Sequence, residues 1–464
     1  MDEQPRLSRR QLLILSGQLG LAAAALAACG APQAPAGGTG SGASQGGAAE
    51  PAQASGEIEF LAWGDAADIA AWEALNAAFA ARNPNVKVNV TTVADPNVNF
   101  YPKLQTAIAG GTPPALSSFQ GWEWQIYADR DLLAPIDDRI AGAGLTPVYD
   151  DSVAAIEGTT KRNGARYLVP LQLATMLMYY SKAAFDEAGI PYPTDDWTFE
   201  EFLEIAKQLT RLDGDQKRYG YQANGQWFRD IHWIRSTGKQ EFDSLIDPKV
   251  AQFNQPEIVE MVQMVAQDFM FSLNISPLQA DVATGANTIE TGGAAMKYEG
   301  PWWLGRMNSP QLRAEGKQIE FDVVLMPAGA ASDRPHRGWS EGVALLKGEK
   351  VDAAWAFASF MAGEEGQRIY SDTTGRMPNT MALIESYWVP KAQEQFQFSN
   401  AAAFIEAFRR GHVDVIGRVP RSKMWSEVVK PVAWDPLLNG SAKAADVLPQ
   451  VDAALQKLLD EANA

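Results

Sequence analysis

Alternating apolar and polar positions give way to helical periodicity several times along the chain, beginning near residue 57. Residues 57–62 alternate as in a half-buried strand, and residues 86–90 do so again. Between these strands, Asp65 suits the N-cap of a helix whose apolar residues over 69–79 share one face. This order predicts a βαβ unit, in which ligands bind outside the carboxyl ends of the strands.

The alternation continues through the rest of the chain. We expect a short helix over residues 101–109, a buried strand over 115–119 and a long strand over 167–180. Thr198-Phe199-Glu200-Glu201 has the pattern of a capping box, and apolar spacing predicts a C-terminal helix around residues 448–459. Alternating strands and helices predict an α/β fold.

The first 56 residues differ in character from the remainder. Three arginines precede an apolar run over residues 12–28, which is the order of a signal peptide, here residues 1–28; residues 8–13 resemble the twin-arginine type. Leu26-Ala27-Ala28-Cys29 resembles a bacterial lipobox, so we expect an acylated Cys29; an uncleaved N-terminal helix is the alternative. Residues 29–56 are mostly Ala, Gly, Ser, Pro and Gln and predict a flexible linker.

The composition of the remaining chain, from about Glu57 to Ala464, narrows the class of protein to which it can belong. It is long enough for two domains, and the formal net charge of −17 argues against nucleic-acid binding. Cys29 is the only cysteine, which excludes an internal disulfide framework and a thiolate metal cluster. His232, His336 and His412 are dispersed along the chain and match no metal-site spacing, so we expect neither a metal nor a cofactor.

Tryptophan is unusually frequent, with 14 residues, and many of them fall in expected loops. A flat apolar ring can stack on the C–H face of a pyranose, so loop tryptophans are typical of sugar sites. For any single tryptophan, a place in the core is the alternative.

Five segments, in the same order along the body, resemble one protein family. They are residues 164–170 (Gly-Ala-Arg-Tyr-Leu-Val-Pro), 179–190, 197–202 (Trp-Thr-Phe-Glu-Glu-Phe), 292–303 (with Gly-Gly-Ala-Ala-Met and Gly-Pro-Trp-Trp) and 375–379 (Gly-Arg-Met-Pro-Asn). The family is that of extracellular solute-binding proteins of carbohydrate ABC importers, of the maltose-binding type.

This resemblance implies a two-lobe periplasmic-binding-protein fold of class II, whose lobes are joined by crossing strands and close over a sugar. We expect residues 57–171 and 343–370 in the N-terminal lobe, and residues 172–342 and 371–464 in the C-terminal lobe. The resemblance also implies a monomeric, exported receptor, anchored at the outer face of the membrane or in the periplasm. Its partners would be a carbohydrate and the permease subunits of an ABC importer.

The site residues follow from the same resemblance and from topology. Trp302 matches the family position at which an indole stacks on the sugar, and one of Trp302 and Trp303 is expected to face the core. At the first strand end, Trp63 and Asp65 are candidates, although Asp65 could be only a helix cap. Further candidates lie in the loop after the 115–119 strand and near the crossing strands. They are Gln120, Trp122, Glu123, Gln172, Trp339, Glu341 and Arg376, with Asn224 and Trp227 as weaker candidates from the second lobe. No carboxylate lies between Pro170 and Tyr180, where some relatives carry one, so the sugar stays open.

Two enzyme classes compete with the receptor. Gly338-Trp339-Ser340-Glu341-Gly342 fits the nucleophile elbow of serine hydrolases, with Asp372 and His412 following in the hydrolase order. However, polar residues precede the segment where a hydrophobic strand is required, and no oxyanion loop is present. A glycosidase is the second class, because Asp65, Glu123 and Glu341 could supply a carboxylate pair.

Within the receptor class, the cargo could also be a glycerol phosphate ester or a peptide. A phosphate ester would require a basic cleft, for which the sequence offers only Arg376 and, less directly, Arg229 and Arg235.

Overall fold

The computed structural model describes residues 54–94, 99–150, 154–213, 217–331 and 334–464. The expected signal peptide, Cys29 and all but the last residues of the linker lie outside these ranges. Within them, no helix is long and apolar enough to cross a membrane.

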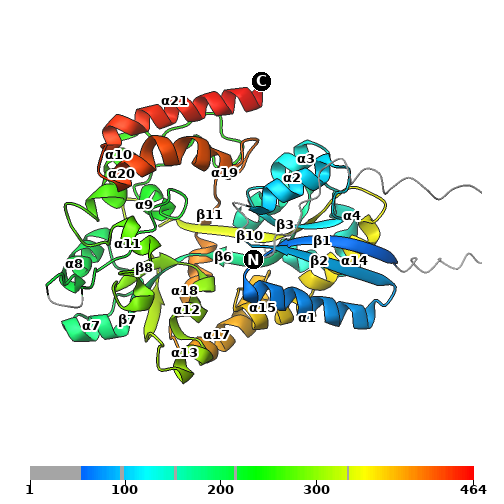
Figure 1. Ribbon diagram of the computed structural model, residues 1–464, viewed down its shortest axis with the longest axis horizontal. Helices are drawn as coiled ribbons and strands as arrows, with labels where there is room; N and C mark the ends of the chain where they lie inside the picture. The colour runs from blue at the N-terminus through cyan, green and yellow to red at the C-terminus, as the bar shows by residue number, and fades with distance from the viewer. Residues whose placement is uncertain (1–53, 95–98, 151–153, 214–216, 332–333) are drawn as a thin grey trace, which may run out of the picture. The chain divides into compact units, whose positions relative to one another are not determined.

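The larger sheet has the order β11-β10-β3-β1-β2, with β6 paired to β10 (Figure 1). β1 is parallel to β2 and β3, β10 is antiparallel to β3 and β6, and β11 is parallel to β10. The strands span Gly56–Trp63 (β1), Val86–Val93 (β2), Leu116–Gln120 (β3), Leu168–Thr175 (β6), His336–Leu345 (β10) and Gly411–His412 (β11).

Helices pack on this sheet as the βαβ pattern predicts. They span Ala66–Arg82 (α1), Tyr101–Ala109 (α2), Gln125–Asp129 (α3), Asp137–Ile140 (α4), Thr146–Asp150 (α5), Ala154–Thr160 (α6), Val351–Ala362 (α14) and Glu364–Thr374 (α15). Asp65 caps α1 in a complete capping box with Asp68. The core beneath them is aromatic, since Phe60 of β1 contacts Trp72 and Phe357 edge-on.

The smaller sheet is antiparallel, in the order β8-β7-β9. Its strands span Leu177–Ser181 (β7), Met296–Glu299 (β8) and Phe321–Val324 (β9); a hairpin of Lys161–Arg162 (β4) and Ala165–Arg166 (β5) stands apart. The helices around it span Lys182–Ala188 (α7), Phe199–Leu209 (α8), Ile231–Arg235 (α9), Pro256–Gln263 (α10), Gln279–Ala283 (α11), Leu304–Asn308 (α12), Pro310–Ala314 (α13), Met381–Leu383 (α16), Val389–Phe396 (α17), Ala402–Arg409 (α18), Arg421–Met424 (α19), Asp435–Leu438 (α20) and Ala444–Asn463 (α21).

Short 3-10 and π-helical turns complete the architecture. The 3-10 turns are Ala141–Ala143 (η2), Ile289–Thr291 (η4) and Pro301–Trp303 (η5), and the π-helical segments are Met264–Asp268 (η3), Ile384–Trp388 (η6) and Trp425–Trp434 (η7). η7 joins α19 to α20 and contains Pro431, which cannot donate a backbone hydrogen bond.

One expected element was wrong. The stretch 167–180 is not a single long strand: β6 belongs to the larger sheet and β7 to the smaller one, and Met176 separates them. Its mostly apolar residues gave no sign of this break, because both strands are buried on both faces. The chain therefore passes from one sheet to the other here, as a crossing connection does.

The hydrophobic core is divided in the same way as the sheets. Two clusters lie around β1–β3, α1 and α14, and two others lie around β7–β9 and around η7 with α21. The architecture is the two-lobe α/β class that the sequence predicted. The lobe boundaries at residues 171/172, 342/343 and 370/371 stay a prediction.

Candidate functional site

A cavity of about 1870 Å³ opens where the carboxyl ends of β1 and β3 face the loops around the smaller sheet. The predicted residues that line it are Trp63, Asp65, Gln120, Trp122, Glu123, Gln172, Asn224, Trp302, Trp303, Trp339, Glu341 and Arg376. They come from segments far apart in the sequence, so the fold brings together nearly the whole predicted set.

Trp227 is the exception. It does not line the cavity, and its ring is buried in the core around η7, where it packs on Phe253 at 5.4 Å and Phe242 at 6.1 Å. Its loop position suggested an accessible ring, but this loop packs into the same hydrophobic cluster as α10 and α21.

The first-lobe corner of the cavity is built on the start of α1. The Asp65 carboxylate accepts hydrogen bonds from the backbone of Ala67 and Asp68, so its cap role is established by geometry. Asp68, which sequence reasoning missed, binds Arg376 through both oxygens, with nitrogen–oxygen distances of 2.6 and 2.9 Å. Burial raises the pKa of Asp68 and Arg376 opposes that shift. Burial also disfavours the charge of Arg376, but Tyr370, Asp68 and Glu341 together hold its pKa above the ordinary value.

Strand β10 supplies three cavity residues by simple alternation. Arg337, Trp339 and Glu341 are two positions apart and all line the cavity. The Glu341 carboxylate accepts hydrogen bonds from the Trp339 indole at 3.1 Å and from the Gln172 amide on β6. Burial raises the pKa of Glu341.

The same alternation argues against the serine hydrolase hypothesis. Ser340 is fully buried in the middle of β10, on the face opposite Trp339, and its hydroxyl is 2.5 Å from that of Thr159. A nucleophile elbow requires a serine exposed at a strand-to-helix turn, and Ser340 lies within a continuous strand.

Two arginines cover the indoles of Trp122 and Trp339. The Arg337 guanidinium lies 4.0 Å from the Trp339 ring centroid, and that of Arg421 lies 4.0 Å from the Trp122 centroid. Buried Asp414 holds both cations, Arg337 through two contacts of 2.9 and 2.6 Å and Arg421 at 2.6 Å. Burial works against ionisation of Asp414, yet the two arginines keep its pKa below the ordinary value. These rings are only about 2% exposed, so neither offers a free face to a solute.

Glu123 joins the two lobes at this point. Its oxygens accept hydrogen bonds from the Ser422 backbone at 3.2 Å and from the Ser422 hydroxyl at 3.0 Å, at the start of α19. Burial raises the pKa of Glu123. The residue lines the cavity as predicted, although both its oxygens are already engaged within the protein.

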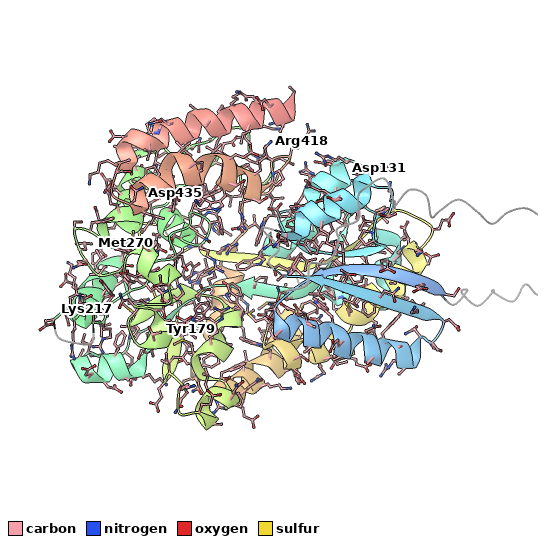
Figure 2. All side chains as sticks on the ribbon, viewed as in Figure 1. Asp131, Tyr179, Lys217, Met270, Arg418 and Asp435 are labelled. Carbon is pink, nitrogen blue, oxygen red and sulfur yellow. The ribbon has the colours of Figure 1, made fainter. Side chains whose placement is uncertain are left out.

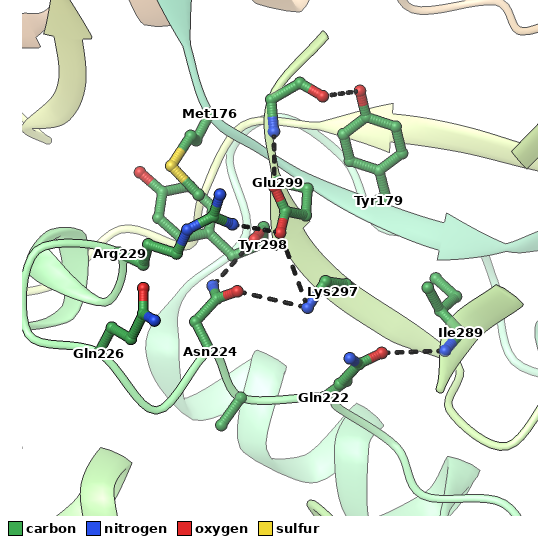
Figure 3. Close-up of polar contacts among 12 residues, drawn as sticks. Met176, Tyr179, Gln222, Asn224, Gln226, Arg229, Ile289, Lys297, Tyr298 and Glu299 are labelled. Carbon is green, nitrogen blue, oxygen red and sulfur yellow. Dashed lines mark hydrogen bonds and ion pairs between the residues drawn. The ribbon is translucent and has the colours of Figure 1, made fainter. Parts of the chain in front are cut away.

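The second-lobe wall is a polar network of Asn224, Arg229, Lys297 and Glu299 (Figure 3). Glu299, at the end of β8, accepts the Nε1 proton of the Trp302 indole at 3.0 Å and binds Arg229 at 2.5 Å. Lys297 lies 3.8 Å from Glu299 and 3.3 Å from the Asn224 side-chain oxygen. The network therefore ties this indole to a row of charged and amide groups.

Trp302 and Trp303 do not divide their roles as the sequence led us to expect. Both are partly buried, both pack against the core around β7–β9, and both line the cavity. They differ in their neighbours, since Trp303 lies under the Arg306 guanidinium at 4.4 Å and Trp302 lies 5.8 Å from that of Arg229. Trp303 also lies 5.3 Å from Lys297, and Trp302 lies 5.8 Å from the Trp339 ring.

Several residues of the site escaped sequence reasoning. They are Asp68, Lys297, Glu299, Arg337, Asp414 and Arg421, whereas sequence reasoning named Arg229 only as a possible cation of a basic cleft. A signal existed for Lys297 and Glu299, which stand two apart directly before Gly300-Pro301-Trp302. No such signal existed for Asp414, because its partners Arg421 and Arg337 are 7 and 77 residues away and no local pattern links them.

Charges along the cavity nearly cancel. Its lining contains nine basic and eight acidic side chains, whereas the whole chain has a net charge of −17. Arg418, labelled in Figure 2, is one of these cations. The described residues contain no group of three His, Cys, Asp or Glu side chains arranged to hold a metal ion. The cavity therefore presents many hydrogen-bonding groups with almost no net charge.

Two α/β lobes around a polar, tryptophan-lined cavity define a solute-binding receptor. The chain belongs to the family of bacterial extracellular solute-binding proteins, whose family model matches residues 63–368. It is accordingly a binding protein of the kind that serves ABC transporters, and not an enzyme; the glycosidase and serine hydrolase hypotheses were wrong.

Individual relatives are distant. A binding protein of Brucella abortus (strain 2308) is 23% identical over 333 residues, covering 69% of this chain and 75% of that protein. The structure of the ABC substrate-binding protein Lmo0181 from Listeria monocytogenes, in complex with cycloalternan, matches with a TM-score of 0.75 and 23% identity over 87% of this chain and 99% of that one. UgpB from Mycobacterium tuberculosis, in complex with glycerophosphocholine, matches with a TM-score of 0.71 and 20% identity over 88% and 99%. At these identities the structural likeness establishes the fold.

Proposed function

We propose that this receptor binds a neutral oligosaccharide in the cavity between its lobes and delivers it to the permease subunits of an ABC importer. The observation that carries the proposal is the partly buried Trp302 indole, set among hydrogen-bonding side chains in a cavity without appreciable net charge. The indole face suits the C–H surface of a pyranose, and the surrounding carboxylates, amides and guanidinium groups suit its hydroxyls.

The size of the cavity supports an oligosaccharide over a monosaccharide. Pockets for small molecules typically have volumes of about 300–1,000 Å³, and this cavity has about 1870 Å³. Aromatic residues line it at separate places, with Trp63 and Tyr101 on one lobe and Trp302, Phe228 and Trp425 on the other. Trp302 and Trp425 are the partly buried tryptophans among these, so more than one sugar unit could contact a ring.

A phosphate ester is the second candidate, because a glycerophosphocholine-bound UgpB shares the fold. The charge pairing supports the sugar over this candidate. Arg376 is paired with Asp68 and Arg229 with Glu299, Arg337 and Arg421 share Asp414, and the lining as a whole has only one more basic than acidic side chain. A phosphate ester would require uncompensated cations, and a peptide would require groups that hold its charged ends.

We further propose that the receptor is a monomer tethered by a lipid on Cys29, with residues 29–56 as the linker. The lobes would divide at the boundaries predicted from the sequence. Closure over the sugar would be the signal that the permease detects, since a ligand shifts such an equilibrium only by binding the closed form more tightly.

A thermal-shift panel tests the cargo. The panel contains glucose, maltotriose, cellotriose and xylotriose, with glycerophosphocholine and a tripeptide as the competing classes. A sugar at a hundredfold excess over its Kd should raise the unfolding free energy by about 2.7 kcal/mol, and Trp302→Ala should remove most of that response. Trp355→Ala is the matched control, because Trp355 is also partly buried but packs against the core around β1 and α14, away from the cavity. A shift with glycerophosphocholine or the tripeptide and none with any sugar would refute the proposal.

A further inference from the structure

The Trp302 ring is held in place by its own neighbours, before any solute arrives. Its Nε1 donates a hydrogen bond of 3.0 Å to Oε2 of Glu299, a residue that is only about 1% exposed. Gly300 packs so closely that a Cβ at this position would overlap the six-membered part of the indole. The ring is thus fixed on one edge by a carboxylate and on its surface by the backbone.

The other oxygen of Glu299 organises the cations around the ring. Oε1 binds the Arg229 guanidinium at 2.5 Å and lies 3.8 Å from Lys297 Nζ (Figure 3). Arg229 in turn lies over the Trp302 ring at 5.8 Å. One buried carboxylate therefore sets the position of the indole and of the guanidinium beside it. Burial lowers the pKa of Lys297, and Glu299 opposes this shift.

The Glu299 carboxylate is already hydrogen-bonded within the protein and needs no donor from a solute. It already accepts from Trp302 and Arg229 and, at 3.4 Å, from the Gly300 backbone. The Trp302 N–H is also consumed, so the indole can offer a solute only its apolar surface. Lys297, which is also buried, lies 3.3 Å from the Asn224 side-chain oxygen, 3.8 Å from Glu299 and 5.3 Å from the Trp303 ring centroid.

The geometry points to Glu299 as a positioning residue for recognition: it fixes the Trp302 indole as a stacking surface for a sugar ring. This inference rests on the proposed function, in that Trp302 contacts the solute. It assigns to Glu299 an effect on affinity that acts through Trp302, and not merely a charge that balances Lys297 and Arg229.

A double-mutant cycle tests the assignment. Binding of maltotriose, or of whichever panel trisaccharide gives the larger thermal shift, is measured by calorimetry for Glu299→Ala and Glu299→Gln, each in the native chain and in Trp302→Phe. Phenylalanine keeps an aromatic surface but has no N–H to donate. Glu299→Ala should weaken binding about tenfold in the native chain and less than about twofold in the Trp302→Phe background. Glu299→Gln, which keeps an acceptor for the indole, should lose only about threefold in the native chain.

Equal losses in both backgrounds would overturn the inference, because the effect would then not pass through Trp302. Glu241→Ala is the control for a purely structural loss. Glu241 is fully buried and paired with Arg235 away from the cavity, so its removal should lower the melting temperature and leave affinity unchanged.

A second measurement needs no sugar and separates the two proposals. In ¹⁵N-tryptophan-labelled protein, the Trp302 indole N–H resonance is identified by its loss in Trp302→Phe. Glu299→Ala should shift this resonance and speed its exchange with water, whereas Glu299→Gln should leave it close to its original position. An unchanged resonance in Glu299→Ala refutes the positioning role. If instead the resonance moves but no panel sugar binds, the proposed function fails and the positioning role stands.

Discussion

Three tryptophans meet in one wall of the cavity, and their surroundings give them different roles. Trp339 lies 5.8 Å from both Trp122 and Trp302, measured between ring centroids. Arg337 and Arg421 cover the rings of Trp339 and Trp122, while Trp302 keeps part of its surface accessible. At the scale of single residues, Trp302 is therefore the most accessible of the three rings, which residue type alone could not show.

Gly300 is the residue on which this surface depends most directly. Its φ of −102° is open to any residue, so backbone conformation does not require glycine here. The requirement is space, because a Cβ would overlap the Trp302 ring. We therefore expect Gly300→Ala to displace the indole and to weaken sugar binding by about tenfold, roughly 1.4 kcal/mol, as measured by calorimetry.

Gly305→Ala is the control for this substitution. It lies a few residues further on, in α12, and its Cβ would meet only Phe396 at 3.8 Å. We expect it to leave affinity unchanged and stability the same or slightly higher, since alanine favours a helix. Equal affinity in both variants would contradict the role given to Gly300.

At the scale of elements, β10 carries chemistry on both of its faces. Its cavity face presents Arg337, Trp339 and Glu341, and its other face carries His336, which lies 5.2 Å from His232 of α9 between ring centroids. His336 Nε2 accepts from the Met326 backbone and Nδ1 faces the Arg334 carbonyl, so the ring is neutral with its proton on Nδ1. His232 lies between the backbone carbonyls of Pro335 and Pro327, and its burial is what disfavours the charged ring.

This contact makes stability depend on pH. Burial lowers the pKa of His232 to about 4, and that of His336 well below its ordinary value. Because the unfolded chain takes up protons first, the stabilisation is complete above about pH 6.5 and is lost as the pH falls toward 4. For His232 the loss is about 3 kcal/mol.

The measurement is the free energy of unfolding in denaturant at several pH values, for the native chain and for His232→Gln. The unfolding free energy of the native chain minus that of His232→Gln should fall by about 3 kcal/mol between pH 7 and pH 4. Comparing the two chains also removes the opposite contribution of Asp230, whose pKa burial raises to about 6. A pH-independent difference would show that His232 does not titrate in this way.

The elements themselves were largely predictable. The 101–109 helix, the N-cap at Asp65, the capping box at Thr198 and the strand–helix–strand start are all present, because each depends on residues a few positions apart. The division of the 167–180 stretch between two sheets was not predictable, since it depends on distant partners. β10 pairs with β6, and β8 and β9 pair with β7.

At the scale of the whole molecule, charge is distributed unevenly. The cavity is nearly neutral, so essentially all of the net charge of −17 lies elsewhere on the chain. A strongly acidic exterior keeps such a protein soluble, and its repulsion of anionic solutes is screened beyond about 8 Å at physiological salt. Under the proposed function, the nearly neutral cavity is therefore expected to favour an uncharged solute.

The proposed anchor is also a property of the whole molecule, since it fixes where the receptor operates. Cys29→Ser should abolish labelling by radioactive palmitate and release the protein from the membrane fraction. Ser44→Ala, in the adjoining linker, should leave both unchanged. A Cys29→Ser protein that stays with the membrane would instead favour the uncleaved N-terminal helix.

The sequence by itself determined the α/β class, the strand-end position of the cavity and twelve of the residues that line it. These follow from short-range periodicity and from motifs whose members are close together. Only the tertiary structure decided which groups are paired and which surfaces are free. Asp68 and Arg376 meet across 308 residues, and Arg337 and Arg421 cover indoles that the sequence could only count. Burial and long-range pairing arise when distant segments pack, and no local pattern of residues contains them.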